Sequence, residues 1–172
     1  MNQVYEKLLG CAESIKKRID FKPETALILG SGLGDYAESI EIKDEISYSD
    51  IEGFPVSTVP GHKGRFVFGY VGKVPVVIMK GRVHYYEGYP MTDVVLPTRL
   101  MGLLGAKNLI LTNAAGGIRS DFEPGDFMII SDHIATNVPN PLIGANLDEL
   151  GPRFPDMSHV YDPEFRAVIQ RD

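Results

Sequence analysis

The sequence contains a single cysteine and no apolar run long enough to cross a membrane. Cys11 has no partner for an internal disulfide, which excludes a disulfide-stapled secreted domain and fits a reducing compartment. A membrane span needs about 18 or more apolar residues, and no stretch approaches that length. The N-terminal segment contains Glu6 and Glu13 and lacks a continuous apolar region, so it does not resemble a signal peptide. We therefore expect a cytoplasmic protein.

Positive charge is also scarce. Lys and Arg total 17 against 23 Asp and Glu, and the net charge of −6 argues against nucleic acid or an anionic membrane as a partner. Two short stretches, "GHKGR" at 61–65 and "KGRVH" at 80–84, are locally positive, a pattern that suits a small anionic ligand better than a polymer. With 172 residues and 44% hydrophobic side chains, the chain can bury a core, and we expect one domain over 1–172.

Apolar periodicity predicts three helices. Spacing of three and four residues predicts an amphipathic helix over 2–19. Residues 91–104 are also expected to be helical, with Pro97 starting or kinking the helix. Near the end of the chain, Asp162 is a good N-cap and Pro163 suits the first position of a last helix.

Short apolar runs predict strands between these helices. A half-exposed strand is expected around 40–48, and "RFVFGYV" and "VPVVIMK" flank Gly72-Lys73 as a hairpin. Buried strands are expected at 25–30, 107–113 and 126–131. Residues 136–162 have little periodicity and predict a long irregular loop or an interface arm. Helices that alternate with strands, plus one hairpin, predict an α/β fold with a mixed sheet.

Three of the strands end in unusual turns, "LILGSGLG", "VIMKGRVHYYEGY" and "LILTNAAGG". Ligands of open α/β sheets bind beyond the carboxyl ends of strands, so these turns are candidates for one site. The glycines of "GSGLG" let backbone N–H groups approach an anion, and Ser31 adds a hydroxyl donor. Arg82 can hold a phosphate through two hydrogen bonds, which a lysine cannot do. The small residues of "NAAGG" leave room for a flat ligand.

Each motif also has a simpler interpretation. "GSGLG" alone is typical of a tight strand-to-helix turn, and its spacing differs from the G-x-G-x-x-G of dinucleotide-binding turns. Ser31 lacks the G-x-S-x-G surroundings of a hydrolase nucleophile. His62, His84 and Glu87 could ligate a metal, but no cysteine accompanies them and H-x-x-E spacing is common, so we expect no metal. His133 is expected to satisfy loop hydrogen bonds.

Four motifs in order, "GSGLG", "PGHKGR", "GRVHYYEGY" and "TNAAGG", make the chain resemble the trimeric purine nucleoside phosphorylases. The downstream "GDFMIISDHI", "NPLIGAN" and "GPRFPDMSHVYD" continue the match, which runs from about residue 25 to the last residue. The related methylthioadenosine phosphorylases differ at two points: their second motif carries further basic residues, and their counterpart of "NAAG" is closer to T-A-C-G.

The resemblance implies a three-layer α/β fold with a mixed central β-sheet flanked by helices. It also implies phosphorolysis of purine ribonucleosides or deoxyribonucleosides to the free base and (deoxy)ribose 1-phosphate, a step of purine salvage. Phosphate is then a co-substrate, and no metal or organic cofactor is required. A cytoplasmic homotrimer is the expected form.

The same resemblance assigns roles to residues in the matching motifs. Phosphate is expected to contact Ser31, His62, Arg82, His84 and the backbone amide of Ala114 or Ala115. The nucleoside is expected to contact Tyr86, the shelf of Ala114, Ala115 and Gly116, and Phe154 from the neighbouring subunit. The expected catalytic residues are His84, Glu87, which orients the site, and His62, which lies near the ribose 5′-hydroxyl.

In this family, the glutamate and asparagine that recognise the purine, and a further phosphate-binding serine, come from later in the chain. We therefore expect the 172 residues to be a truncated domain with little or no activity alone, and the preferred base is not readable from them. Two alternatives stay open: a methylthioadenosine phosphorylase, and a non-catalytic fragment that binds phosphate or a nucleotide.

Overall fold

The computed structural model describes residues 2–56 and 64–171. The chain divides into two compact units, an N-terminal unit that ends at Ala114 and a C-terminal unit that begins at Ala115. Within the described ranges, every helix is too short or too polar to cross a membrane.

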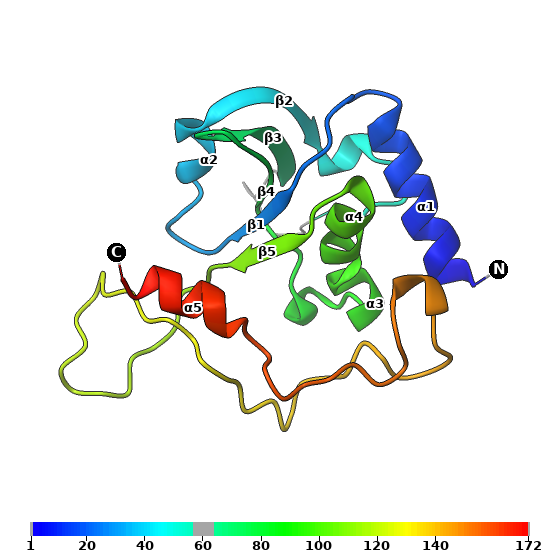
Figure 1. Ribbon diagram of the computed structural model, residues 1–172. Helices are drawn as coiled ribbons and strands as arrows, with labels where there is room; N and C mark the ends of the chain where they lie inside the picture. The colour runs from blue at the N-terminus through cyan, green and yellow to red at the C-terminus, as the bar shows by residue number, and fades with distance from the viewer. Residues whose placement is uncertain (1, 57–63, 172) are drawn as a thin grey trace. The chain divides into compact units, whose positions relative to one another are not determined.

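The N-terminal unit is built on a five-stranded sheet with the strand order β2-β3-β4-β1-β5 (Figure 1). β4, β1 and β5 are parallel, whereas β3 pairs antiparallel with both β2 and β4. The predicted mixed sheet is therefore confirmed, and so is the hairpin in which Gly72 and Lys73 join β3 to β4. The strands are β1 (Thr25–Leu29), β2 (Glu41–Ser47), β3 (Arg65–Val71), β4 (Val74–Lys80) and β5 (Asn108–Leu111).

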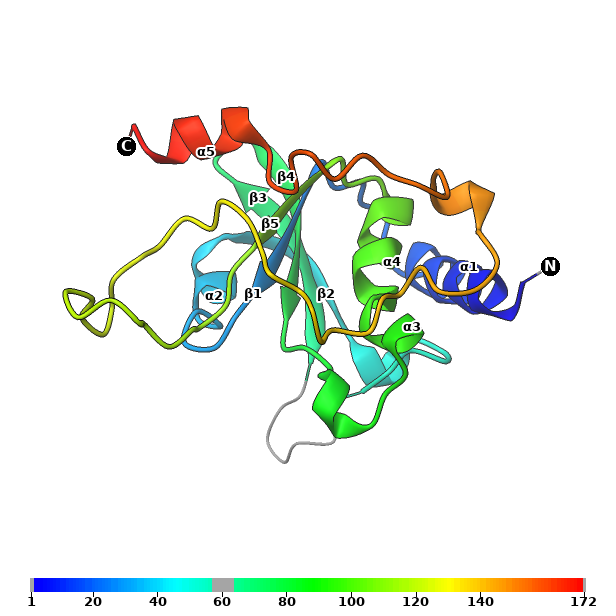
Figure 2. The same ribbon diagram turned by 90° about the horizontal axis from the view of Figure 1, so that it is seen from below.

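Helices cover both faces of this sheet, which confirms the three-layer α/β fold (Figure 2). On one side lie α1 (Gln3–Lys16), α3 (Met91–Val94) and α4 (Leu96–Leu104), and on the other lies α2 (Tyr36–Ser39). The helix predicted over 91–104 is divided at Val95, and Pro97 falls in the first turn of α4, where a helix needs no backbone N–H. Pro97 therefore starts a helix, as expected.

The core follows from the apolar periodicity of the helices. In α1 and α4 the residues at helical spacing, among them Leu8, Ile15, Leu100 and Met101, are buried. On the opposite face, α2 contributes the fully buried Ala37. That side chain belongs to a second apolar cluster with Leu29, Val67, Val76 and Ile78. Because Leu29 precedes the "GSGLG" turn and Ala37 follows it, packing anchors the turn at both ends.

The C-terminal unit has little regular structure. Its described residues include the short 3₁₀ helix η3 (Asp148–Leu150) and α5 (Pro163–Ile169). As predicted, Asp162 caps α5: its carboxylate accepts hydrogen bonds from the N–H groups of Glu164 and Phe165, at 2.8 and 3.0 Å. The long irregular segment predicted for 136–162 is confirmed.

Two predictions about apolar runs are wrong. Residues 126–131 form no strand, and Phe127 is 88% exposed. A strand needs a partner for its N–H and C=O groups, and this run pairs with no described strand. The strand within 107–113 does form as β5, but Leu109, Ile110 and Leu111 are 41–51% exposed instead of buried. In the described part of the chain β5 is an edge strand, paired only with β1.

Candidate active site at the carboxyl ends of three strands

The carboxyl ends of β4, β1 and β5 lie side by side at one edge of the sheet. Leu29, the last residue of β1, is in register with Lys80, the last residue of β4. On the other side of β1, Ile28 is in register with Leu111, the last residue of β5. The three turns that follow these strands therefore start from one edge, as the sequence predicted.

The turns after β1 and β5 are in direct backbone contact. The Gly30 N–H donates to Thr112 Oγ1 at 2.8 Å, and the Thr112 N–H donates to the Ile28 carbonyl at 3.0 Å. A Cβ atom on Gly30 would lie 2.6 Å from the Cα of Asn113, so only glycine fits there. Ser31 and Ala114 each lie one residue from this contact. Two of the predicted phosphate-binding positions are thus brought together.

The segment after β4 is organised by Glu87. Its carboxylate Oε1 accepts a hydrogen bond from the His84 N–H at 2.8 Å, and its own N–H donates to the His84 carbonyl at 3.0 Å. These bonds close the 3₁₀ helix η2 (Tyr85–Glu87). The rings of His84 and Tyr86 stack with centroids 4.8 Å apart, and Tyr86 is 77% exposed. Glu87 therefore fixes the backbone of His84 through both bonds.

Arg82 lies at a cavity beside this segment. Within residues 2–56 and 64–171, its guanidinium forms no hydrogen bond or ion pair, so its N–H donors are available to an anion. Arg82 and His84 are polar members of a lining that is otherwise largely apolar. The cavity has a volume of about 240 Å³ and is lined by Ile28, Met79, Arg82, Val83, His84, Tyr85, Val94 and Thr98.

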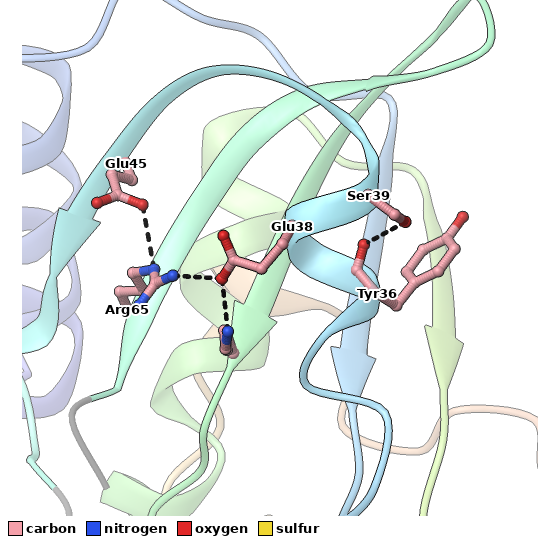
Figure 3. Close-up of polar contacts among 6 residues, drawn as sticks. Tyr36, Glu38, Ser39, Glu45 and Arg65 are labelled. Atoms are coloured by element: carbon pink, nitrogen blue, oxygen red, sulfur yellow. Dashed lines mark hydrogen bonds and ion pairs between the residues drawn. The ribbon is translucent and has the colours of Figure 1, made fainter. Parts of the chain in front are cut away.

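Arg65 and Lys80, by contrast, are already paired. Glu38 Oε1 accepts hydrogen bonds from Arg65 Nη2 and from Lys80 Nζ, both at 2.5 Å (Figure 3). Arg65 Nε also lies 3.1 Å from Glu45 Oε2. The hydrogen bond from Lys80, followed by the charges of Lys80 and Arg65, lowers the pKa of Glu38. Part of the positive charge in the two basic stretches is therefore already balanced within the fold.

Comparison with known proteins identifies the family. The profile of the phosphorylase superfamily matches residues 24–172. The chain belongs to this superfamily. Purine nucleoside phosphorylase 1 of Geobacillus stearothermophilus is 54% identical over 159 residues, which are 92% of this chain and 58% of that protein. The purine nucleoside phosphorylase of Bos taurus is 45% identical over 167 residues, which are 94% of this chain and 57% of that protein.

Solved structures agree. The purine nucleoside phosphorylase of Schistosoma mansoni in complex with acetate matches with a TM-score of 0.89 at 41% identity, covering 96% of this chain and 62% of that one. The resemblance predicted from the four motifs is confirmed. The chain spans less than two thirds of the length of these phosphorylase relatives.

The remaining predicted site residues are His62, Ala115, Gly116 and Phe154. His62 falls outside the described residues. Ala115, Gly116 and Phe154 belong to the C-terminal unit. All three are exposed, Phe154 by 87%. Phe154 follows Arg153, whose Nη1 donates to the carbonyls of Leu142 and Gly144 at 2.9 and 2.7 Å, so the loop that carries the ring is braced internally.

One further loop prediction holds, and three residues with structural roles were not predicted from the sequence. His133 was expected to satisfy loop hydrogen bonds, and its Nδ1 indeed makes a short contact with the Tyr161 hydroxyl. Sequence reasoning missed Thr112 and Glu38, described above, and Tyr48, whose hydroxyl donates to the Gly81 carbonyl at 2.8 Å. The sequence offered only a weak signal for Thr112, a hydroxyl side chain directly after a predicted strand. No local pattern marks Glu38 or Tyr48.

Proposed function

We propose that the protein is a purine nucleoside phosphorylase, which converts a purine nucleoside and phosphate into the free purine and (deoxy)ribose 1-phosphate. The observation that carries the proposal is Arg82, which has no partner among the described residues, at the edge where the turns bearing Ser31 and Ala114 meet. Relatives from Schistosoma mansoni, solved with inosine, with hypoxanthine, or with cytosine and ribose-1-phosphate, support the substrate class.

In the proposed reaction, a phosphate oxygen forms a bond to C1′ of the sugar while the bond from C1′ to the purine nitrogen breaks. The electron pair of that bond leaves with the purine, which takes up a proton. The transition state has oxocarbenium character, as in glycoside hydrolysis. Arg82 would hold phosphate through two hydrogen bonds, aided by the Ser31 hydroxyl and the Ala114 N–H. Orientation of phosphate below C1′ would supply a large part of the rate.

The remaining proposed roles concern the sugar, the base and the orientation of His84. His84, oriented by Glu87, would contact phosphate, and Tyr86, stacked on His84, would contact the ribose. His62 would lie near phosphate and the ribose 5′-hydroxyl. The purine would lie over a shelf of Ala114, Ala115 and Gly116. Phosphate is a co-substrate, and this chemistry requires no metal or organic cofactor.

The proposed assembly is a cytoplasmic homotrimer that acts in purine salvage, with both units belonging to a single phosphorylase domain. Phe154 would complete the site of the neighbouring subunit. In support, Phe154 is 87% exposed on a loop that Arg153 braces. Large aromatic side chains of this kind are enriched at subunit interfaces.

The test of the function is phosphate-dependent release of hypoxanthine from inosine by the whole protein. Methylthioadenosine is offered in parallel, and omission of phosphate is the control. Phosphate-dependent turnover of inosine supports the proposal, and faster turnover of methylthioadenosine would replace it with the related phosphorylase activity. Phosphate binding without turnover of either nucleoside would instead favour a non-catalytic protein that binds phosphate.

The shared site has its own test. Phe154→Ala and Arg82→Ala variants are each expected to be severely impaired, because each would damage a different half of the same site. If Phe154 acts in the neighbouring subunit, mixed oligomers of the two variants contain some intact sites and regain activity. Mixed oligomers that form but stay inactive would show that each subunit holds a complete site.

A further inference from the structure

Tyr48 is hydrogen-bonded to Gly64 and Gly81, one glycine from each of the two basic stretches. It begins the 3₁₀ helix η1 (Tyr48–Asp50) and is 2% exposed. Its backbone N–H donates to the Gly64 carbonyl at 3.0 Å, and its hydroxyl donates to the Gly81 carbonyl at 2.8 Å. Burial raises the pKa of Tyr48, so the hydroxyl keeps the proton that this second bond requires.

Packing holds the Tyr48 ring in one place. The ring lies against Phe54 and Phe66, with centroid separations of 4.8 and 5.0 Å. A Cβ atom on Gly64 would lie 2.2 Å from the Tyr48 ring, so the ring occupies the space that any other residue at 64 would need. The hydroxyl therefore approaches Gly81 from a fixed direction.

The Gly81 carbonyl belongs to the peptide unit that leads directly to Arg82. Gly81 has a φ of +86°, a conformation that glycine adopts readily. Because glycine lacks a Cβ atom, its backbone can rotate more freely than that of any other residue. Rotation at this position would swing Arg82 as a whole. A hydrogen bond to the Gly81 carbonyl opposes that rotation, because it fixes the plane of the peptide between residues 81 and 82.

We propose that Tyr48 is a positioning residue for phosphate: its hydroxyl holds the Gly81 carbonyl and thereby aims Arg82 at the anion. The inference rests on the proposed function, since it takes phosphate as the ligand of Arg82. Tyr48 itself does not touch phosphate in this arrangement.

The test replaces the hydroxyl alone. Tyr48→Phe keeps the ring that packs on Phe54 and Phe66, so the fold should be retained. Titration with inorganic phosphate, followed calorimetrically in the whole protein, should show a dissociation constant raised about three- to tenfold, the effect of one hydrogen bond. The nucleoside KM should stay within about twofold of wild type, a split that general destabilisation would not produce. Titrations are made at a temperature where near-ultraviolet circular dichroism shows both proteins folded.

Tyr89→Phe is the matched control. The Tyr89 hydroxyl also donates to a backbone carbonyl, that of Val56, at 2.6 Å, but this carbonyl is not attached to Arg82. Phosphate affinity of this variant should equal that of wild type within about twofold. An equal loss in both variants would indicate a general effect of removing a tyrosine hydroxyl and would overturn the proposal.

A double-mutant cycle decides whether Tyr48 acts through Arg82. In an Arg82→Lys background, Tyr48→Phe should cause little further loss of phosphate affinity. The same loss in both backgrounds, or no loss in either, overturns the proposal while leaving the proposed function intact. A wild-type protein that binds no phosphate and cleaves no nucleoside would overturn both.

Discussion

Arg82 and the pair formed by Arg65 and Lys80 lie at the same end of the β3–β4 hairpin but differ in their partners. Arg65 and Lys80 face each other across the two strands and share the carboxylate of Glu38. Arg82, two residues after Lys80, has no partner among the described residues. All three cations come from stretches that the sequence marks as positive. Which of them is paired is decided by the acceptors that the fold brings near.

This difference separates charges that hold elements of the fold together from a charge that is left for the proposed phosphate. A carboxylate shared between two cations ties α2 to both strands of the hairpin, which helps to hold the turn between β1 and α2 in place. A half-buried arginine without a partner keeps all its N–H donors for an incoming anion. We therefore expect substitutions in the two groups to change different measurable quantities.

The largest effect should come from Arg82→Lys. The charge is kept, but the two-bond contact to phosphate is lost, and one charge-assisted hydrogen bond is worth about 1.5–3 kcal/mol. The phosphate KM should therefore rise about 10- to 150-fold, while the nucleoside KM changes little. Steady-state kinetics with phosphate varied measures this. Arg65→Lys is the control, and an equal rise in both variants would erase the distinction between the two groups.

A smaller effect, on stability, is expected from Glu38→Gln. Folding lowers the pKa of Glu38 below its ordinary value, mainly because its carboxylate accepts the hydrogen bond from Lys80. Such a carboxylate stabilises the folded state at pH values above its unfolded pKa, and the contribution is lost as the pH falls through its folded pKa. The urea concentration at the midpoint of unfolding should therefore be higher for wild type than for the variant near pH 7. The difference between the two midpoints should disappear at acidic pH.

Urea unfolding at several pH values tests the Glu38 prediction against Glu13→Gln. Glu13 is an exposed carboxylate on α1 with its Lys17 partner 3.8 Å away, so its loss should leave the unfolding midpoint nearly unchanged at every pH. A gap between wild type and Glu38→Gln that does not change with pH would mean that the ion pairs contribute nothing.

The smallest effect is expected from Lys80→Met. Glu38 keeps Arg65 as a partner, and partly exposed ion pairs contribute little to stability, so the melting temperature should fall by only about 2 °C. Phosphate affinity should stay within about twofold of wild type, because the Lys80 charge is already balanced. Calorimetry gives both quantities. A loss of phosphate affinity as large as that of Arg82→Lys would make Lys80 a phosphate ligand.

Local sequence signals predicted the parts of the fold that local physics determines. The Asp162 cap, the helix start at Pro97 and the Gly72-Lys73 hairpin each follow from residues a few positions apart, and all three are present. The parallel strand ends were also predictable, because apolar runs that alternate with helices favour a sheet of that kind.

What the sequence could not show depends on contacts between distant residues. An apolar run predicts a strand, but whether it pairs or is covered depends on its neighbours. Residues 126–131 were therefore wrongly predicted to form a strand, and β5, correctly predicted as a strand, was wrongly predicted to be buried. Thr112, Glu38 and Tyr48 matter through partners 27 to 82 positions away. No pattern within a short window marks such residues.

The contact between Gly30 and Asn113 limits how this protein can vary. Within "GSGLG", Gly34 has an ordinary 3.6 Å neighbour where its Cβ would lie, so natural variants with alanine there should persist. Gly32, at φ +87° with open space around it, should drift only toward residues that accept a left-handed backbone, such as asparagine. Gly30 has no permitted substitute while the turns after β1 and β5 touch. The three glycines look interchangeable in the motif, but they differ in the substitutions that they tolerate. Gly30 tolerates none, Gly32 tolerates few and Gly34 tolerates alanine.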